Sequence, residues 1–383
     1  MTRRRQLLLA LGAAALGPTP ARAQRPDGPA PTEARIETRT LARGLANPWS
    51  IACLPDGRLL VTERPGRLRV VASDGALSRP VTGLPPVLER GQGGLLDVVL
   101  APDFASSGWI YWSFAEAGND GPGGPNGTSV ARSRLDLGAL ALRDVQVLFR
   151  QQPRVDSSLH FGSRLVFAPD GRLWVTLGDR GSRRDDAQRL DNDLGKVLRL
   201  DSDGRAAPGN PYKERAVLWS HGHRNVQGAA LHPHTGELWT HEHGPQGGDE
   251  LNADLAGRNY GWPQVTWGRE YVSGLRIGEG TSRADVEPAV HTWVPSIAPS
   301  GLAFLTSDRY GPTPRAPQAS AFVGALKARA LVRLDLDGRR VLRETRYALD
   351  ERVRDVRQSP DGWLLLATDD REDGRILRVE RLG

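Results

Sequence analysis

A short turn-and-strand pattern recurs six times along the chain. The six segments are LPDGRLLVTE from Leu54, APDFASSGWIYWSF from Ala101, APDGRLWVTL from Ala168, HPHTGELWTH from His232, PSGLAFLTS from Pro299 and SPDGWLLLAT from Ser359. In each, Pro fixes φ, Asp or His caps a turn, Gly takes a positive φ, and an apolar strand follows. Spacings of roughly 45 to 70 residues suit four short strands and a loop. The repeat predicts one all-β domain over residues 24–383, a six-bladed β-propeller of four-stranded antiparallel blades. A β-sandwich or two barrels is the alternative.

The first 23 residues differ from the rest of the chain. Arg3–Arg5 form a cationic head, Leu7–Leu16 an apolar run, and Ala21–Ala23 a small-residue cleavage site. This pattern predicts an export signal for residues 1–23, read by the twin-arginine or the general secretory route, with cleavage near Ala23. The expected location is therefore the periplasm or the exterior. No stretch approaches the ~20 consecutive apolar residues of a membrane span, so none is expected.

Composition limits the class of protein and of partner. The 383 residues are 39% hydrophobic, enough for a large core. Cys53 is the only cysteine, so no disulfide within the chain is expected. Removing the signal takes away four arginines and no acids, which lowers the formal net charge from +6 to +2. This small excess argues against a nucleic-acid partner.

Two kinds of metal site are conceivable from the histidine-rich part of the chain. All eight histidines lie between His160 and His291, and the pairs His221/His223 and His241/His243 have the i, i+2 spacing that a Zn²⁺ or Cu²⁺ site uses. The stretch HGPQGGDE, residues 243–250, instead offers free carbonyls and acidic oxygens, which Ca²⁺ prefers. An ordinary acidic hairpin turn is the alternative for this stretch.

Two further groups of residues have the chemistry of an active site. His160 and Asp179 are separated by a strand and its turn, so that Asp179 can orient His160 as a general base if both lie on the axial face of the propeller. Lys327, Arg352 and Arg354 are candidates for holding a polyanionic ligand at the axis, although such charges more often mark a solvated face.

Seven motifs in this order resemble one known family. They are GQGGLLDVVLAPDF, SSLHFGSRLVF, GDRG, HGHRNVQG, EHGPQGGDELN, NYGWP and RVRDV, and they run through nearly the whole chain after the signal. The ordered set resembles the soluble pyrroloquinoline-quinone-dependent sugar dehydrogenases, and within them the bacterial periplasmic aldose dehydrogenase branch. The resemblance implies oxidation of an aldose at C1 to the lactone, with pyrroloquinoline quinone and Ca²⁺ as cofactors and an external electron acceptor as partner.

The resemblance also implies roles for particular residues. His160 matches the general base that takes the C1 hydroxyl proton while hydride passes to the quinone, Asp179 matches the carboxylate that holds this base, and Arg224 matches a group that stabilises developing negative charge. The implied quinone contacts are Gln92, Arg224, Asn225, Tyr271, Lys327, Arg352 and Arg354. The implied Ca²⁺ ligands are the carbonyls of Gly244 and Pro245 beside the quinone, and Glu250 and Tyr260 at a second, structural site. Ser296 stands where the glucose-dehydrogenase branch has a threonine contact, and we assign it no role.

Two other functions are compatible with the predicted fold, because fold alone does not decide function. A Ca²⁺-dependent lactonase or hydrolase would need acidic side chains around an axial metal and would not use the Lys327, Arg352 and Arg354 cluster. A non-catalytic sugar-binding propeller would not need a base such as His160 beside the axis.

Overall fold

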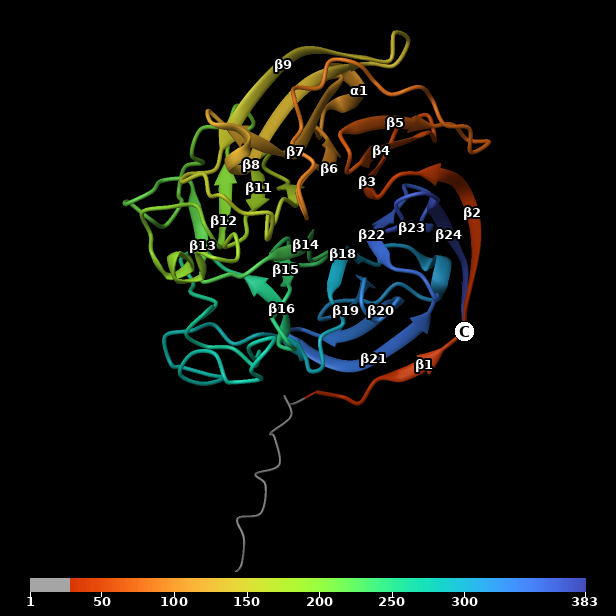
Figure 1. The fold of residues 1–383 in the computed structure, drawn as a ribbon. Coiled ribbons are helices and arrows are strands. Elements are labelled where there is room, and N and C mark those ends of the chain that lie inside the picture. The colour runs from red at the N-terminus through yellow and green to blue at the C-terminus, as the bar shows by residue number, and fades with distance from the viewer. Residues whose placement is uncertain (1–27) are drawn as a thin grey trace, which may run out of the picture.

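Six antiparallel sheets surround a central axis, which confirms the six-bladed β-propeller (Figure 1). The computed structural model describes residues 28–383, so the predicted export signal, residues 1–23, lies outside the described part of the chain. None of the helices among residues 28–383 is long and apolar enough to cross a membrane.

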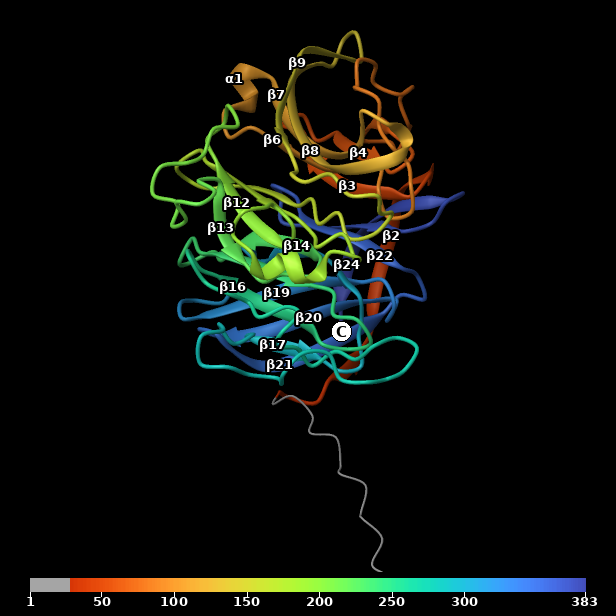
Figure 2. The same cartoon turned by 60° about the vertical axis from the view of Figure 1, so that its left-hand side comes forward.

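The strands of each blade run outward from the axis in chain order. Blade 1 contains β3 (Pro48–Cys53), β4 (Leu59–Glu63) and β5 (Arg67–Val71). Blade 2 contains β6 (Leu95–Leu100), β7 (Trp109–Gly118), β8 (Gly121–Asp136) and β9 (Ala141–Arg150). Blade 3 contains β10 (Leu165–Phe167), β11 (Leu173–Thr176), β12 (Lys196–Leu200) and β13 (Leu218–His221). Figure 2 shows β8 and β9 of blade 2 curving together at one edge of the molecule.

The second half of the chain repeats this arrangement and then closes the ring. Blade 4 contains β14 (Val226–Leu231), β15 (Leu238–Glu242), β16 (Asp249–Asp254) and β17 (His291–Trp293). Blade 5 contains β18 (Pro299–Phe304), β19 (Gln318–Ala325), β20 (Ala330–Asp337) and β21 (Arg340–Ala348), with β1 (Thr32–Ala34) added in parallel to β21. Blade 6 contains β22 (Val353–Gln358), β23 (Leu364–Thr368) and β24 (Gly374–Leu382), and its outer strand is β2 (Ile36–Leu45) from the other end of the chain. Pairing of β2 with β24 closes the ring without a covalent link (Figure 1).

Blade 1 departs from four regular strands, and blade 5 departs from the turn that the sequence predicted. In blade 1 the fourth position is taken by an irregular segment, where the N–H groups of Ser78 and Val81 donate to the carbonyls of Val70 and Leu68. In blade 5 the segment from Pro299 is the inner strand itself, whereas its sequence predicted a turn followed by a strand. Proline is tolerated as the first residue of a strand, so Pro-Ser-Gly resembles a turn there without forming one.

The core consists of apolar layers between neighbouring blades. Six clusters of buried side chains occupy the six blade interfaces, for example Leu60, Val98 and Trp112 between blades 1 and 2. Each blade therefore buries both faces, which explains why strands such as β4 (LLVTE) read as continuous buried runs instead of alternating ones.

Polar residues of the inner strands cross the axis. Arg164 forms ion pairs with Asp355 (2.8 Å) and Asp97 (3.4 Å), and Arg357 pairs with Asp97 (2.6 Å) and Asp355 (3.0 Å). These four charges come from blades 2, 3 and 6 and compensate one another. Arg164 also lies over the ring of Trp49 (4.2 Å to its centroid), which lines the pocket described next.

Candidate active site

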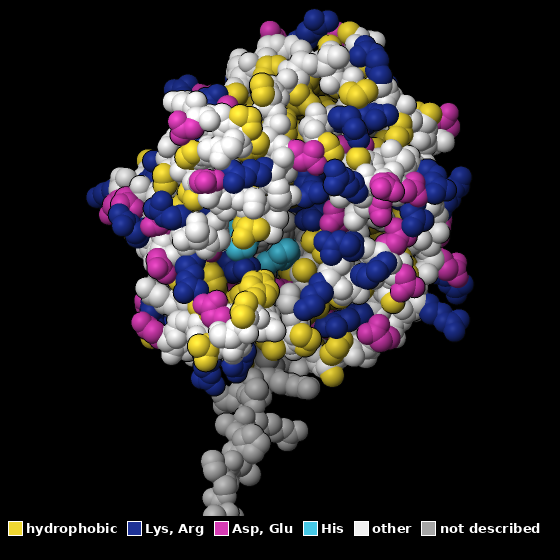
Figure 3. Space-filling model, viewed as in Figure 1, with side chains coloured by type: hydrophobic (Ala, Val, Ile, Leu, Met, Phe, Trp, Pro, Cys, Tyr) yellow, Lys and Arg dark blue, Asp and Glu magenta, His cyan; other side chains and the backbone are white. Residues whose placement is uncertain are grey.

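A pocket of about 350 Å³ is formed by residues from all around the ring. Side chains of both charges border the central hollow of this face, with histidines visible inside it (Figure 3). The lining residues are Asn47, Trp49, Arg64, Gln92, Leu96, Phe161, Gly162, Ser163, Gln227, His243, Ala298, Leu326, Arg352, Arg354 and Asp369. Loops and strand ends of different blades thus converge on one cavity, as expected at the axial face of a propeller.

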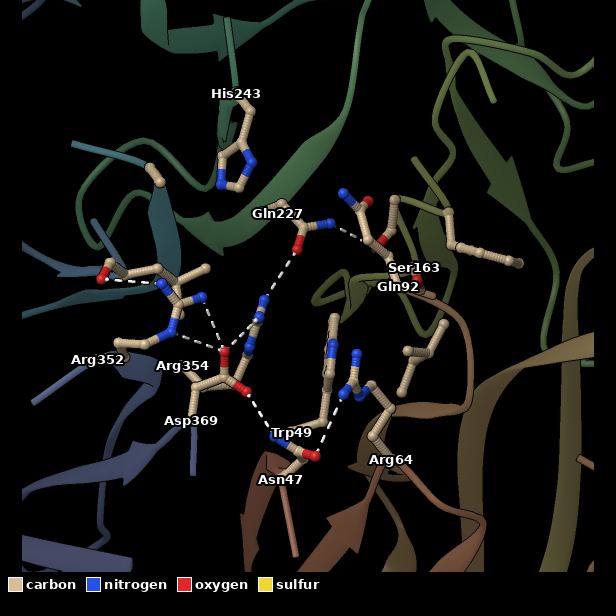
Figure 4. A pocket seen from close by; sticks show the side chains of 15 residues that line it. Asn47, Trp49, Arg64, Gln92, Ser163, Gln227, His243, Arg352, Arg354 and Asp369 are labelled. Atoms are coloured by element: carbon tan, nitrogen blue, oxygen red, sulfur yellow. Dashed lines mark hydrogen bonds and ion pairs between the residues drawn. The ribbon is translucent and has the colours of Figure 1, made fainter. Parts of the chain in front are cut away.

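Positive charge predominates in this pocket, because three guanidinium groups face a single carboxylate (Figure 4). Asp369 Oδ2 accepts from Arg352 (3.0 Å) and Arg354 (3.2 Å), and Oδ1 accepts from Asn47 (3.2 Å). Although burial opposes it, Arg354 and Arg352 lower the pKa of Asp369 to about 2, so this carboxylate stays ionised. Arg64 is joined to the network through Asn47 Oδ1 (3.2 Å). The excess of guanidinium groups fits a ligand that carries several carboxylates.

The predicted His160–Asp179 pair is formed. His160 Nδ1 donates to Asp179 Oδ1 at 2.6 Å, and both side chains are buried. The two residues are separated by two strands, β10 and β11, not by the single strand that we expected. The hairpin explains why the two side chains meet. The two ends of an antiparallel hairpin lie at the same edge of the sheet, whereas the ends of a single strand lie at opposite edges.

The backbone of His160 is held in an unusual conformation. Its φ of 50° is uncommon for a residue other than glycine, and its N–H donates to Oε1 of Gln92 at 2.8 Å. A Cβ at position 178 would collide with the His160 carbonyl, so Gly178 is required for this approach. The predicted contact residue Gln92 therefore lines the pocket and also fixes the backbone of His160.

The electrostatic surroundings keep this histidine neutral. Burial and the nearby Arg224 lower the pKa of His160 below its ordinary value, against the raising effect of Asp179. Burial raises the pKa of Asp179, but the hydrogen bond from His160, the charge of Arg224 and the N–H of Gly181 together outweigh this effect, so the pKa lies below its usual range. Nδ1 is engaged by an ionised carboxylate, and the hydrogen bonds of His160 among the described residues involve its backbone N–H and Nδ1 but not Nε2. A neutral imidazole with a free Nε2 can accept a proton.

Arg224 and Asn225 do not line the pocket but contact residues that do. Arg224 Nη1 donates to the carbonyls of His243 (3.0 Å) and Gly244 (2.9 Å). Asn225 Oδ1 accepts from the N–H of Gly162 (3.2 Å) and from Gln227 Nε2 (3.3 Å). Arg224 therefore joins the neighbourhood of His160 to the loop at Gly244, whereas Asn225 supports two residues that line the pocket.

The loop His243–Gly248 offers carbonyl oxygens to a cation. A guanidinium group already occupies the carbonyls of His243 and Gly244, so these oxygens are turned toward positive charge. Asp249 is not a free ligand, because its oxygens accept from the N–H groups of Gly244, Ile297 and Ala298 and from the hydroxyl of Ser296. The donor set at Gly244 and Pro245 is thus backbone oxygen, which suits Ca²⁺.

Glu250 and Tyr260 meet at a second, very small cavity. The cavity has a volume of about 10 Å³, which is roughly the room that one water molecule needs. Glu242 and Gly244 also line it. The Tyr260 hydroxyl donates to the Ala253 carbonyl (2.6 Å) and accepts from the Leu255 N–H (2.8 Å), so its backbone carbonyl is the remaining ligand atom. Carboxylate and carbonyl oxygens around one small void are compatible with the predicted second Ca²⁺ site.

The paired histidines do not form a transition-metal site. His221 Nδ1 bonds the Tyr212 hydroxyl (2.7 Å), and the rings of His241 and His243 bond the carbonyls of Gly301 (3.2 Å) and Pro299 (2.7 Å). Within residues 28–383, no three His, Cys, Asp or Glu side chains converge on a point that could hold a metal ion.

Besides Arg224 and Asn225, two further predicted quinone contacts do not line the pocket. Lys327 is exposed, although its neighbour Leu326 lines the cavity. Tyr271 is 64% exposed on the loop between β16 and β17. Of the predicted contacts, Gln92, Arg352 and Arg354 line the pocket directly.

Several residues of the site were not predicted from the sequence. They are Asn47, Trp49, Arg64, Gln227 and Asp369 in the pocket, and Trp262 beside Asp179. His243, which the sequence offered only as one of a pair of possible metal ligands, also lines the pocket. For Trp262 the motif NYGWP gave a signal without a role. Asn47 and Asp369 bond each other across 322 residues of sequence, and no local pattern announces such a contact.

Known proteins share this fold and much of this sequence. Residues 45–378 match the family model described as Glucose / Sorbosone dehydrogenase. Aldose sugar dehydrogenase YliI of Escherichia coli (strain K12) is 42% identical over 355 residues, covering 90% of this chain and 93% of that protein. A crystal structure of glucose dehydrogenase superposes with a TM-score of 0.85 at 45% identity, covering 90% of this chain and 99% of the other. The PQQ-bound aldose sugar dehydrogenase from Streptomyces coelicolor gives a TM-score of 0.72 at 29% identity, covering 91% and 99%. The chain therefore belongs to the Glucose / Sorbosone dehydrogenase family.

Proposed function

We propose that this protein oxidises aldose sugars at C1 to the corresponding lactone, with pyrroloquinoline quinone as the bound oxidant, and passes the electrons to an external acceptor. The observation that carries the proposal is the neutral His160, held by Asp179 with Nε2 free, beside a cavity with three guanidinium groups. Sugar-oxidising relatives, one of them solved with the quinone bound, support it.

The pocket fits the quinone by its donor set. Pyrroloquinoline quinone carries three carboxylates, and Arg64, Arg352 and Arg354 supply guanidinium groups to meet them. When bound, the quinone supplies the acceptor for the hydride that leaves C1 of the sugar. The carbonyls of Gly244 and Pro245 would hold a Ca²⁺ that polarises the quinone, and Glu250 and Tyr260 would hold a second, structural Ca²⁺.

The residues of this chain perform the proton chemistry. His160 Nε2 accepts the proton of the C1 hydroxyl as the C–H bond breaks, and Asp179 stabilises the imidazolium that forms. The Arg224 guanidinium donates to the carbonyls of His243 and Gly244. From there it would stabilise negative charge on the reacting carbonyl oxygen of the quinone. The predicted export signal places the activity in the periplasm or outside the cell.

The test is reconstitution of the purified apoprotein with pyrroloquinoline quinone and Ca²⁺, followed by dye reduction with a panel of aldoses. We expect reduction that requires both the quinone and a sugar, and that falls when Ca²⁺ is chelated. Quinone binding without reduction by any aldose would contradict the proposal. A lactonase would instead hydrolyse lactones without the quinone, and the three pocket arginines would have no part in that reaction.

A further inference from the structure

Trp262 binds the carboxylate that orients the base. Its indole Nε1 donates to Asp179 Oδ2 at 2.7 Å, across 83 residues of sequence. The other oxygen, Oδ1, accepts from His160 Nδ1 (2.6 Å) and from the N–H of Gly181 (2.7 Å). Both oxygens of Asp179 are therefore held by donors, and these donors come from three separate segments of the chain.

Trp262 is itself rigidly placed. It is 7% exposed and packs with Ala187 and Ile277 in a small apolar cluster. The backbone N–H of Trp262 donates to the carbonyl of Gly222 (2.9 Å), and its backbone carbonyl accepts from Gln188 Nε2 (2.7 Å). A tryptophan fixed by packing and by two backbone hydrogen bonds can in turn fix the group that its indole N–H binds.

The Trp262 ring also contacts Arg224, another of the predicted catalytic residues. The Arg224 guanidinium lies 5.3 Å from the centroid of the Trp262 ring, within the range of a cation–π contact. Trp262 thus contacts two of the three predicted catalytic residues, although it does not line the pocket.

We propose that Trp262 is a positioning residue for this reaction, which locks the rotation of the Asp179 carboxylate so that Oδ1 faces His160 Nδ1 and Nε2 remains directed at the substrate. A carboxylate held at one oxygen only can turn about its last side-chain bond, and the imidazole would turn with it. The inference rests on the proposed function, because it acts through His160 as base.

The first test removes only the indole N–H. Trp262→Phe keeps an aromatic ring against Ala187, Ile277 and Arg224 but loses the donor to Asp179. We expect kcat to fall by roughly 10- to 100-fold, the size of a lost hydrogen bond to a charged group, with little change in KM for the sugar or in quinone affinity. The matched control is Trp293→Phe, since Trp293 is 2% exposed and its indole nitrogen has no acceptor among the described residues. This control should retain nearly full kcat.

A double-mutant cycle separates positioning from packing. If Trp262 acts through Asp179, the Phe substitution should lower kcat much less in an Asp179→Asn background than in the wild type. Equal factors in both backgrounds, or a Trp262→Phe enzyme that matches Trp293→Phe, would overturn the inference. If the wild type and Trp293→Phe themselves show no quinone-dependent sugar oxidation, the proposed function fails instead, so the two failures are distinct.

A further measurement leaves Trp262 in place. In protein labelled with ¹⁵N at its ten tryptophans, Asp179→Asn should shift one indole N–H resonance strongly, because a charge-assisted bond becomes a neutral one. A spectrum in which no indole resonance moves would overturn the inference even if the Phe variant does not fold.

Discussion

His160 and His223 occupy matching places in two neighbouring blades. Each precedes an inner strand, β10 or β14, and each donates from Nδ1 to a carboxylate 19 residues later, Asp179 (2.6 Å) or Glu242 (2.8 Å). In both blades a hairpin of two strands separates the partners, so the repeat itself brings them together. The same local design is therefore used twice, once beside the pocket and once in the interior.

The two pairs differ in what surrounds the second ring nitrogen. His160 Nε2 forms no hydrogen bond with the described residues, and burial lowers the pKa of this histidine. His223 Nε2 bonds the Ser220 hydroxyl (2.8 Å) and lies 3.6 Å from Asp254, and although burial opposes it, Glu242 raises the pKa. The repeat supplies a histidine–carboxylate pair twice, and the surroundings favour the neutral imidazole at His160 and the charged imidazole at His223.

The largest expected effect separates the pairs by activity. His160→Gln should lower kcat by roughly 10²-fold or more, the usual loss when a general base is removed, because His160 is the imidazole that Asp179 holds. Quinone affinity should stay close to that of the wild type, measured by titration of the apoprotein. Retention of turnover in this variant would show that His160 is not the base.

The next effect concerns stability and the buried pair of His223 and Glu242. His223→Gln removes a buried cation from between Glu242 and Asp254, which should cost roughly 3–5 kcal/mol of unfolding free energy. Because the folded-state pKa of His223 is raised, its stabilisation is fully present below the ordinary histidine pKa and is lost as pH rises through the folded value. Denaturant unfolding at acidic and alkaline pH should thus show a gap between variant and wild type that narrows on the alkaline side. A gap independent of pH would mean that His223 is not charged in the folded protein.

The pattern that made both pairs is also what the sequence predicts best. The six turn-and-strand segments predicted six blades, and the structure has six. The fifth repeat failed as a turn because Pro299 begins a strand instead. Such periodic signals are local, so a single sequence carries them.

The cross-blade contacts of the site could not be predicted in this way. Asp369, Asn47 and Arg64 meet only when β2 closes the ring against β24, and Trp262 reaches Asp179 from the next blade. Each of these residues is an ordinary Asp, Asn, Arg or Trp in its own segment. Their common role depends on long-range closure, which no spacing within one blade encodes.

The pH dependence of turnover tests whether His160, in its pair with Asp179, is neutral. A histidine that acts as the proposed base must be neutral to accept a proton; the pKa of His160 is lowered from its ordinary 6.5, and Asp179 remains ionised because its pKa is lowered too. We expect kcat of the reconstituted enzyme to be constant from neutral pH to about 6.5 and to fall about tenfold per pH unit only below the folded-state pKa. An acid limb with its midpoint above 6.5 would indicate that the carboxylate dominates, as it does at His223.

The smallest expected effect is on quinone affinity. It compares two cationic residues that were both predicted to contact the quinone, one inside the pocket and one outside it. Arg352 lines the cavity and bonds Asp369 at 3.0 Å, whereas Lys327 is exposed. Arg352→Gln and Lys327→Gln remove equal charge, so their long-range effects on an anionic quinone are nearly matched and largely screened by salt. Arg352→Gln should weaken quinone binding about tenfold, as expected for one lost charge-assisted contact, and Lys327→Gln should change it by less than about twofold. Titration of both apoproteins with pyrroloquinoline quinone at physiological ionic strength measures the difference. Equal losses would mean that Lys327 turns into the pocket when the quinone binds.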